Sequence, residues 1–185
     1  AIMKLWLGVP PHRSGVFSAG NGPAMRRAIL GVAFGKDISI LNDWVLRSTR
    51  ITHSDPKAFY GALAVAIAAH LNSFSQNILP QRFLQIINTA LDGHESLEFI
   101  ELMNKAASSA QKNQSVDDFA QSIGSKHGIT GYIYHTVPCV IQVWLRYQED
   151  FVGGIQEIIS AGGDTDTTGS ILGAIIGTRD GKNGI

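Results

Sequence analysis

Apolar residues recur every three or four positions along most of the chain, whereas alternation of β-branched and polar residues over five or more positions is nearly absent. The first spacing gathers apolar side chains on one face of a helix, and the second would be needed for a half-buried strand. The pattern therefore predicts an all-α chain. Its longest strongly apolar run is ALAVAIAA, residues 62–69, whose small side chains favour close contact with neighbouring helices. We expect this run to lie in the central buried helix.

Prolines, capping residues and glycines predict where the helices begin and end. Asp55 followed by Pro56 places a cap and a proline at the start of the central helix, and Pro23 is expected at the first position of a helix over 24–34. Further helices are predicted at 44–51 (capped by Asp43), 81–91 (opened by Pro80 and closed by Gly93), 95–112, 116–123 (after a capping box at Ser115), 136–147, 149–160 (closed by Gly162) and about 168–177. No repeat, low-complexity tract or linker divides the chain, so a single domain over residues 1–185 is expected.

The charge balance changes which partners are expected. The chain has 15 Lys and Arg residues against 15 Asp and Glu residues, and charged residues make up only 16% of it. Because binding to a polyanion needs a basic surface, nucleic acid is not an expected partner. The run over 62–69 is much shorter than the roughly 20 residues that cross a bilayer, and the first residues fit neither a signal peptide nor a transit peptide. No membrane association is therefore expected.

The single cysteine, Cys139, lies in the apolar run VPCVIQVW, where a buried and inert thiol is expected. With one cysteine the chain has no internal disulfide, which is typical of a reducing compartment. We therefore expect a cytoplasmic protein.

The segment SAGGDTDTTGSILG, residues 160–173, combines two carboxylates with three threonine hydroxyls directly before an apolar run. Near a helix N-terminus a carboxylate gains about 0.3 to 1 kcal/mol from the helix dipole, so the segment is typical of a helix cap. One cap needs only one carboxylate, however, and Asp164 and Asp166 repel each other unless a cation lies between them. Hard divalent cations prefer carboxylate and hydroxyl oxygens, so a metal site and an elaborate cap both stay open. An EF-hand is excluded, because its twelfth position falls on Ile175 instead of Glu.

A second candidate is the loop SAGNGPAMRRAILG, residues 18–31. Gly20 and Gly22 allow a ligand to approach the backbone closely, and a helix beginning at Pro23 would direct its free N–H groups at a phosphate or diphosphate. The alternative is an Asn-Gly turn without a ligand, which is the commoner case for such a dipeptide. His53 either donates a hydrogen bond to a ligand or completes a turn. A Walker loop and a serine hydrolase are excluded, because neither the GxxxxGK[ST] spacing nor a GxSxG elbow occurs.

Four segments follow one another in a fixed order: SAGNGPAMRRAILG, THSDPKAFYGALAVA, GYIYHTVPCVIQVWLR and GGDTDTTGSILGAIIG. They span residues 18–177. These segments and their order resemble those of the ADP-ribosylglycohydrolase family. The resemblance implies an all-α fold that holds two magnesium ions at the mouth of a helical bundle. It also implies a magnesium-dependent hydrolase, which cleaves the glycosidic bond between ADP-ribose and a modified protein side chain or related conjugate.

The resemblance assigns roles to particular residues. Asp164, Asp166 and Thr167 are the expected metal ligands. The two aspartates are also expected to be catalytic, since a carboxylate that holds the metal can accept a proton from the attacking water. The residues expected to line the diphosphate and the nearby ribose are Ser18, Gly20, Asn21, Gly22 and Met25. His53 is expected to touch the same ligand, and Gly131 and Tyr132 are expected near its adenosine end.

Members of the resembled family also carry a glycine-rich segment and paired aspartates upstream of the loop over residues 18–22, here called the GNG loop, and a further helix downstream. This sequence includes neither. We therefore expect a domain truncated at both ends, as a fragment, a degenerate relative or one half of an assembly. Two magnesium ions need about twelve ligand positions, so weak metal binding by this chain alone is expected. The alternative function is that of a catalytically inactive protein, which binds ADP-ribose or is structural like the crystallin members of the family.

Overall fold

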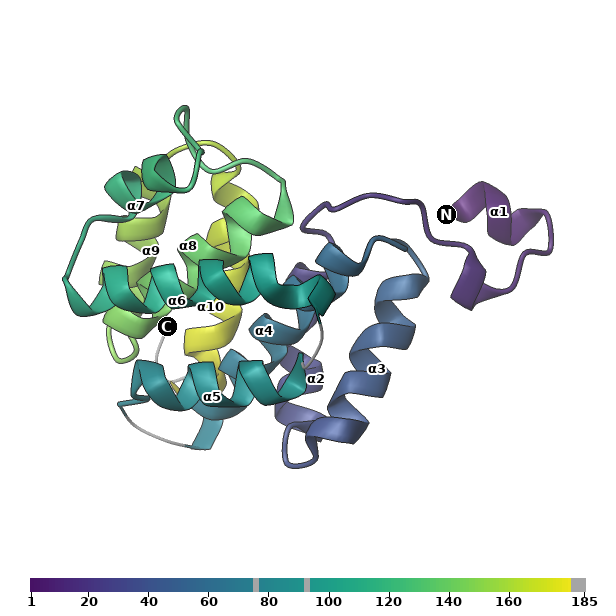
Figure 1. The fold of residues 1–185 in the computed structure, drawn as a ribbon, viewed down its shortest axis with the longest axis horizontal. Coiled ribbons are helices and arrows are strands. Elements are labelled where there is room, and N and C mark those ends of the chain that lie inside the picture. Colours follow the sequence, from purple (N-terminus) through teal and green to yellow (C-terminus); the bar gives the residue numbers. More distant parts are fainter. Residues whose placement is uncertain (75–76, 92–93, 181–185) are drawn as a thin grey trace.

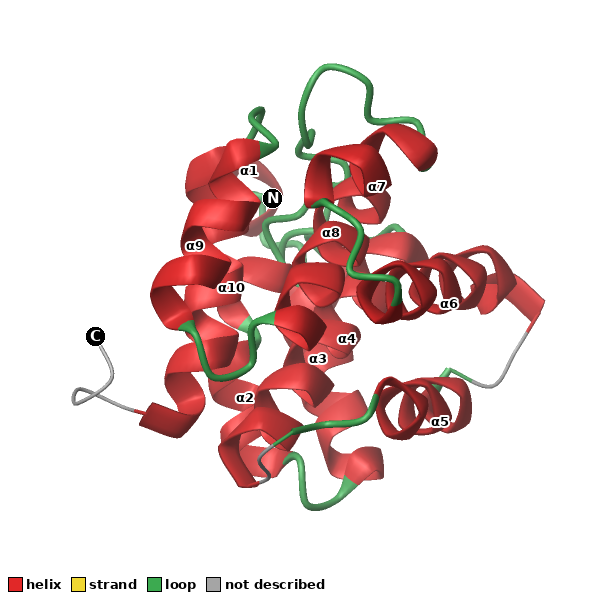
Figure 2. Cartoon of the chain, turned by 90° about the vertical axis from the view of Figure 1, so that its left-hand side faces the viewer, coloured by secondary structure: helices red, strands yellow, loops and turns green. Residues whose placement is uncertain are grey.

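The computed structural model describes residues 1–74, 77–91 and 94–180, and over these residues the predicted all-α class is confirmed. Figures 1 and 2 show α2 to α10 packed into one body. The α-helices and the 3₁₀ helices (η) are α1 (Ile2–Trp6), η1 (Pro11–Arg13), η2 (Ala24–Arg26), α2 (Ala28–Phe34), α3 (Ile38–Arg50), α4 (Pro56–Phe74), α5 (Pro80–Ala90), η3 (His94–Ser96), α6 (Leu97–Gln111), α7 (Val116–Ser122), α8 (Ile133–Arg146), α9 (Phe151–Ser160) and α10 (Thr165–Asp180). In the described part of the chain, extended segments pair only at isolated bridges between loops. No described helix is both long enough and apolar enough to cross a membrane.

Helix α4 is the centre of the fold, as the sequence predicts. Every residue over 61–69 is buried, and helices α2, α3, α8 and α10 pack around it. Small residues let these helices come close. A Cβ atom on Gly31 of α2 would overlap the backbone carbonyl of Ala66, and one on Gly61 would overlap the side chain of Ile133. The interior is therefore packed so closely that neither glycine has room for a methyl group.

A single buried amide ties three of these helices together near the C-terminal end of α4. The Asn72 side chain donates through Nδ2 to the carbonyl oxygens of Ile175 and Ile176 in α10, at 3.1 Å each. Its Oδ1 accepts from Trp144 Nε1 of α8 at 3.0 Å. Asn72 and Trp144 are fully buried, so these polar atoms would otherwise be unsatisfied. The amide therefore fixes α4, α8 and α10 relative to one another.

Several predicted helix boundaries are confirmed. The Asp55 carboxylate accepts from the Lys57 backbone N–H at 2.9 Å, at the start of α4. Pro80 opens α5, and the Ser115 hydroxyl caps α7 by accepting a backbone N–H. The predicted closing role of Gly93 lies outside the described residues.

The prediction that Asp43 caps a helix is wrong. The cap of α3 is Asp37, whose carboxylate accepts from the backbone N–H groups of Ser39 and Ile40. Asp43 lies within the helix and pairs with Arg47 at 2.8 Å on its exposed face. Helix α3 therefore begins almost two turns earlier than expected.

Two other boundaries differ from the prediction. The helix expected over 24–34 is divided at Arg27 into η2 and α2, so Pro23 precedes a single 3₁₀ turn instead of opening an α-helix. Helix α8 begins at Ile133, about one turn earlier than predicted, and Pro138 consequently lies inside it.

Helix α10 also begins about one turn earlier than predicted, at Thr165. Gly162 and Gly163 take φ values of +68° and +83°, which turn the chain directly before the helix. Asp164 therefore immediately precedes α10, and Asp166 lies in its first turn.

Cys139 is buried in α8, as predicted. Burial raises the pKa of its thiol far above the usual value. The thiol is therefore protonated at neutral pH and unreactive.

The first residues form an arm beside the body. Figure 1 shows α1 apart from the other helices, and none of its residues is buried. Lys4 Nζ donates to the Gly15 carbonyl at 2.9 Å, which holds α1 near the end of the arm. The Gly15 N–H in turn donates to the carbonyl of Arg50 at the end of α3, at 3.0 Å. The arm therefore joins the body directly before the GNG loop.

Replacing Gly31 with alanine is expected to destabilise the protein by about 2 to 3 kcal/mol, because the added methyl group overlaps the Ala66 carbonyl and α2 must move away from α4. The matched control is Gly177→Ala in α10, where a Cβ atom meets nothing within 4 Å and alanine favours the helix by up to about 1 kcal/mol. Urea unfolding of both variants beside the wild type measures the two changes. Equal stability of the two variants would contradict the close packing of α2 on α4.

Candidate functional site

The GNG loop, residues 18–22, lies against the segment that leads into α8. The backbone N–H of Asn21 donates to the Gly131 carbonyl at 3.0 Å, and that of Ile133 donates to the Ala19 carbonyl at 2.9 Å. Two motifs that are far apart in the sequence are therefore neighbours in the fold.

The glycine pair before α10 lies against the same segment. The Ile129 N–H donates to the Gly162 carbonyl at 3.0 Å, and the Asp164 N–H donates to the Ile129 carbonyl at 2.7 Å. Gly163 lies between these bonds with a positive φ, and a Cβ atom on it would overlap the backbone of Ile129. Only glycine adopts a positive φ readily and also leaves room for the backbone of Ile129. The double glycine of the GGDTDT motif therefore allows two backbones to approach and brings Asp164 to the loops.

The side chain of Asn21 joins the three segments. Its Nδ2 donates to Asp164 Oδ2 at 2.7 Å and to Thr136 Oγ1 at 3.0 Å. The buried Thr136 hydroxyl donates in turn to the Thr130 carbonyl at 2.9 Å. Gly131 lies beside this contact, since a Cβ atom on it would be 3.4 Å from Asp164 Oδ2. The structure therefore brings together three of the predicted residues, from three separate segments, around one amide.

Asp164, Asp166 and Thr167 gather at the N-terminus of α10. Partial burial would raise the pKa of Asp164, but hydrogen bonds from Asn21 and Thr167 outweigh the burial, so the pKa lies below its ordinary value. Asp164 is therefore ionised at neutral pH. The exposed Asp166 carboxylate is close enough to interact with it. The positive end of the helix dipole offsets part of this negative charge.

The capping interpretation and the metal interpretation both keep support. The Asp164 carbonyl accepts the Thr168 N–H at 3.1 Å, and its carboxylate interacts with the Thr167 N–H, as in a helix cap. The carboxylates and the Thr167 hydroxyl are also oxygens that Mg²⁺ prefers, but they supply fewer than the about six ligands of one ion. Within the described ranges, no group of three or more His, Cys, Asp and Glu side chains is placed to hold a metal ion. These residues fit part of a magnesium site, and the two predicted ions stay a prediction.

His53 lies against the GNG loop, where it is predicted to meet a ligand. A Cβ atom on Gly20 would be 3.2 Å from its Nε2, and one on Gly22 would be 3.4 Å from its Cε1, so the two glycines leave room for the ring. The Ser18 hydroxyl lies 3.5 Å from the same position on Gly20. The ring Nδ1 contacts the Thr52 hydroxyl at 2.9 Å. Burial and two neighbouring arginines lower the pKa of His53, so a neutral ring faces the loop at pH 7.

Met25 and Tyr132 lie at the edge of this group. The Met25 N–H donates to the Asn21 carbonyl at 3.4 Å, while the residue as a whole is 47% exposed. The Tyr132 hydroxyl accepts from Lys57 Nζ at 3.1 Å, so the tip of this side chain lies beside α4. The ligand contacts predicted for both residues stay predictions.

Thr136 belongs to the candidate site but was not predicted from the sequence. It is buried in α8 among apolar residues, and its hydroxyl holds Asn21 against the Thr130 carbonyl. The sequence offers one signal for it, a threonine directly before the apolar run VPCVIQVW. This signal is not specific, because a buried threonine hydroxyl can also bond within its own helix.

A model of the ADP-ribosylglycohydrolase family matches residues 1–185. The chain belongs to this family. It is similar to an uncharacterized protein of Archaeoglobus fulgidus, with 29% identity over 181 residues that cover 97% of this chain and 55% of that protein. It is also similar to ADP-ribosylhydrolase ARH3 of Homo sapiens (26% identity over 191 residues, 92% of this chain and 52% of the relative) and of Mus musculus (27% over 185 residues, 89% and 50%). The chain thus spans about half the length of the curated relatives it matches.

Replacing Asn21 with alanine is expected to destabilise the metal-free protein by about 2 kcal/mol at pH 7, because Asp164 and Thr136 lose their shared donor. The depressed pKa of Asp164 contributes stability above its unfolded pKa of about 3.9, and this contribution is lost as the pH falls through the folded pKa. The difference in the free energy of unfolding between variant and wild type should therefore shrink below about pH 4. Urea unfolding between pH 3 and pH 7 in the presence of a chelator measures it.

The matched control is Asn88→Ala on the exposed face of α5, which should change stability by less than about 0.5 kcal/mol. A pH-independent loss of stability in Asn21→Ala would contradict the contact between Asn21 and an ionised Asp164.

Proposed function

We propose that this chain hydrolyses the glycosidic bond between ADP-ribose and a modified side chain. The observation that carries the proposal is the meeting of the GNG loop and the GGDTDT motif at the hydrogen bond between Asn21 and Asp164. The family to which the chain belongs, and the relatives named ADP-ribosylhydrolases, support the same reaction class.

The diphosphate and the adjacent ribose would bind at the GNG loop. Gly20 and Gly22 carry no side chain that would keep a ligand from the backbone, and the neutral His53 ring beside them offers Nε2 for a hydrogen bond. The dipole of η2 adds little, because η2 is a single turn of 3₁₀ helix. The loop and His53, rather than a helix N-terminus, would therefore carry the binding.

The two aspartates would act on the sugar. Breaking a glycosidic bond develops positive charge on the ribose, which nearby carboxylates stabilise. Asn21 helps keep Asp164 ionised for this purpose. Asp166 is exposed, so a water molecule can reach it and transfer a proton to it as the water attacks the anomeric carbon.

Magnesium belongs to this proposal, with Asp164, Asp166 and Thr167 as its ligands in this chain. When bound, the ion would orient the ribose hydroxyls and lower the pKa of a bound water. Further ligands would be water molecules or groups outside the described residues.

One observation favours a second candidate function, the binding of ADP-ribose without hydrolysis. Only two carboxylates come together at the N-terminus of α10 among the described residues, and no third acidic, histidine or cysteine side chain joins them as a metal ligand. A site that binds the ligand but holds its metal weakly would hydrolyse the conjugate slowly or not at all.

The proposal is tested by incubating the chain with ADP-ribosyl-serine and with ADP-ribosyl-arginine, with magnesium or with a chelator, and measuring released ADP-ribose by chromatography. Release is expected with magnesium. Asp164→Ala and Asp166→Ala should each lower the rate about 100-fold or more, since each removes a carboxylate from the reacting sugar.

The control is Asp43→Ala, which removes an exposed carboxylate on α3 and should leave the rate unchanged. Full activity in both site variants would refute the roles given to these aspartates. Tight binding of ADP-ribose by calorimetry, without release from either conjugate, would favour the second function.

A further inference from the structure

The hydrogen bonds around His53 determine which of its two ring nitrogens carries the proton in the neutral ring. The Thr52 hydroxyl lies 2.9 Å from His53 Nδ1, and either group can be the donor. If Nδ1–H donates, the other nitrogen, Nε2, has no proton. If the hydroxyl donates, the proton lies on Nε2. The other partners of the hydroxyl distinguish these two arrangements.

The Thr52 hydroxyl has one acceptor left to it among the described residues. Its oxygen accepts from Arg26 Nη2 at 2.9 Å, and a guanidinium group only donates. The Thr49 carbonyl lies 3.5 Å away, but it already accepts the backbone N–H groups of Thr52 and His53, at 3.0 and 2.8 Å. A carbonyl oxygen has two lone pairs, so both are in use. The Thr52 hydroxyl therefore donates to His53 Nδ1, and the ring proton lies on Nε2.

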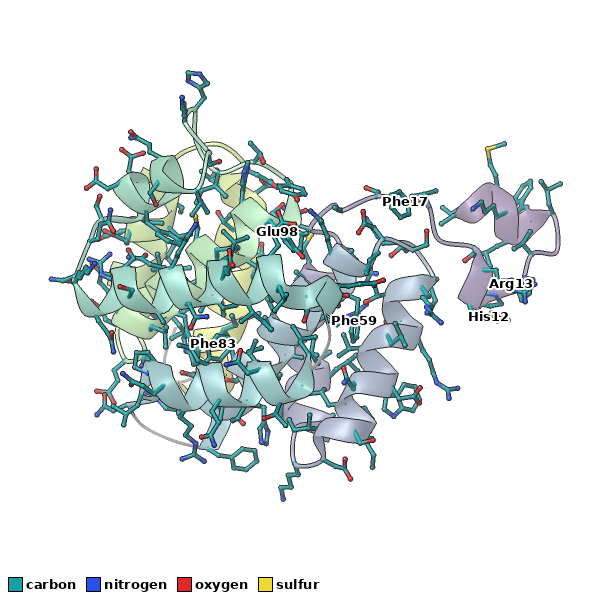
Figure 3. All side chains as sticks on the ribbon, viewed as in Figure 1. His12, Arg13, Phe17, Phe59, Phe83 and Glu98 are labelled. Atoms are coloured by element: carbon teal, nitrogen blue, oxygen red, sulfur yellow. The ribbon has the colours of Figure 1, made fainter. Side chains whose placement is uncertain are left out.

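The backbone that carries these two side chains is held by the arm. The Val16 N–H donates to the Thr52 carbonyl at 3.0 Å, and the Ser54 N–H donates to the Val16 carbonyl at 2.9 Å. Figure 3 labels Phe17, the next residue, where the chain passes from the arm to the body. Because backbone bonds hold the chain on both sides of His53, the Thr52 hydroxyl and the His53 ring keep their relative positions.

His53 Nε2 faces the GNG loop without a hydrogen-bond partner in the described part of the chain. It lies 3.2 Å from the place where Gly20 would carry a Cβ atom, and 3.9 Å from the corresponding place on Gly22. A protonated Nε2 therefore directs a donor at a loop that has no side chain there to accept it. The oxygens of a diphosphate are negatively charged at neutral pH, so they accept hydrogen bonds and match this donor.

Positive charge beside the ring favours both the neutral histidine and an anion. Burial, together with Arg26 and Arg27, lowers the pKa of His53, and Asp55 opposes them only in part. Arg27 is 1% exposed, and its guanidinium donates to Thr49 Oγ1 at 3.3 Å. It takes part in none of the ion pairs of the described residues. The positive charge of Arg27 is therefore left without a carboxylate partner near His53.

We propose that Thr52 is a positioning residue, which keeps the proton of the His53 ring on Nε2, where it donates to an oxygen of the ADP-ribose diphosphate. The inference rests on the proposed function and adds to it the residue that sets the hydrogen-bonding role of His53. Thr52 acts through His53 and does not touch the ligand. With the proton on Nδ1, the lone pair of Nε2 would face the anionic oxygens and repel them.

The proton is located by proton–nitrogen correlation NMR of the ligand-free full chain, with isotopically labelled histidine at neutral pH. The His53 signals are those that are missing from His53→Leu. The wild type should show a protonated Nε2 and an unprotonated Nδ1. Thr52→Val removes the donor and keeps the volume, so a fraction with the proton on Nδ1 should appear. Thr52→Ser retains the hydroxyl and should keep the wild-type spectrum. A proton on Nδ1 in the wild type, or an unchanged spectrum in Thr52→Val, would overturn the proposal.

The effect on the ligand is tested by calorimetry with ADP-ribose. Thr52→Val should weaken binding about threefold to tenfold, because part of the population loses its donor to the diphosphate. Thr52→Ser should restore the affinity to within about twofold of the wild type. The matched control is Thr89→Val on α5, which removes an exposed hydroxyl that bonds to the Gln85 carbonyl of its own helix and should leave the affinity unchanged. Equal affinity of Thr52→Val and the wild type would contradict the role of Thr52.

His53→Leu shows whether Thr52 acts through the ring. It should weaken ADP-ribose binding about tenfold or more, because a hydrogen bond to a charged oxygen is lost. In this background Thr52→Val should have no further effect, since no ring is left to position. Losses that multiply in the double variant overturn the inference and leave the proposed function intact. If ADP-ribose does not bind to the wild type, the proposed function fails, and the role of Nε2 as a donor to the diphosphate fails with it.

Discussion

The burial of α4 is the constraint on which the rest of the structure depends. Because residues 61–69 are covered by α2, α3, α8 and α10, these helices are positioned by one shared neighbour, and Gly31 and Gly61 set how closely two of them approach. Near the C-terminal end of α4, Asn72 bonds to Trp144 of α8 and to two carbonyl groups of α10, so it fixes both helices there. The opposite ends of α8 and α10 are thereby held side by side, and the loops that precede them carry the candidate site.

The site is a product of tertiary structure that no local pattern connects. Asn21 is 115 positions from Thr136 and 143 positions from Asp164, yet one amide group bonds to both. The contact exists only if α8 and α10 keep their positions on α4. A substitution in the core that moves either helix should therefore disturb the site, even though it touches no site residue.

The elements that could be predicted from the sequence are those that depend on local chemistry. The central helix, the Asp55 cap and the Pro80 start follow from residues within one turn of each boundary. The start of α10 could not be found in this way, because threonines are poor helix formers and the helix begins where Gly163 docks on Ile129, far away in the sequence. The resemblance to a family supplied the names of the site residues. It could not supply the buried Thr136 that holds Asn21 or the contacts of Lys57, which exist only in the packed structure.

The charge balance at the N-terminus of α10 bears on the proposed reaction. The helix dipole supplies about half a positive charge there, against the two negative charges of Asp164 and Asp166. Asn21 is neutral, so its hydrogen bond keeps Asp164 ionised without cancelling any charge. About one and a half negative charges are therefore left at the N-terminus of α10, whereas Arg26 and Arg27 add positive charge near His53, beside the loop where the anionic diphosphate would bind. The like charges of the two aspartates repel each other unless a cation lies beside them. In the proposed reaction a cation beside the two aspartates would relieve this repulsion, while the arginines offer positive charge to the diphosphate.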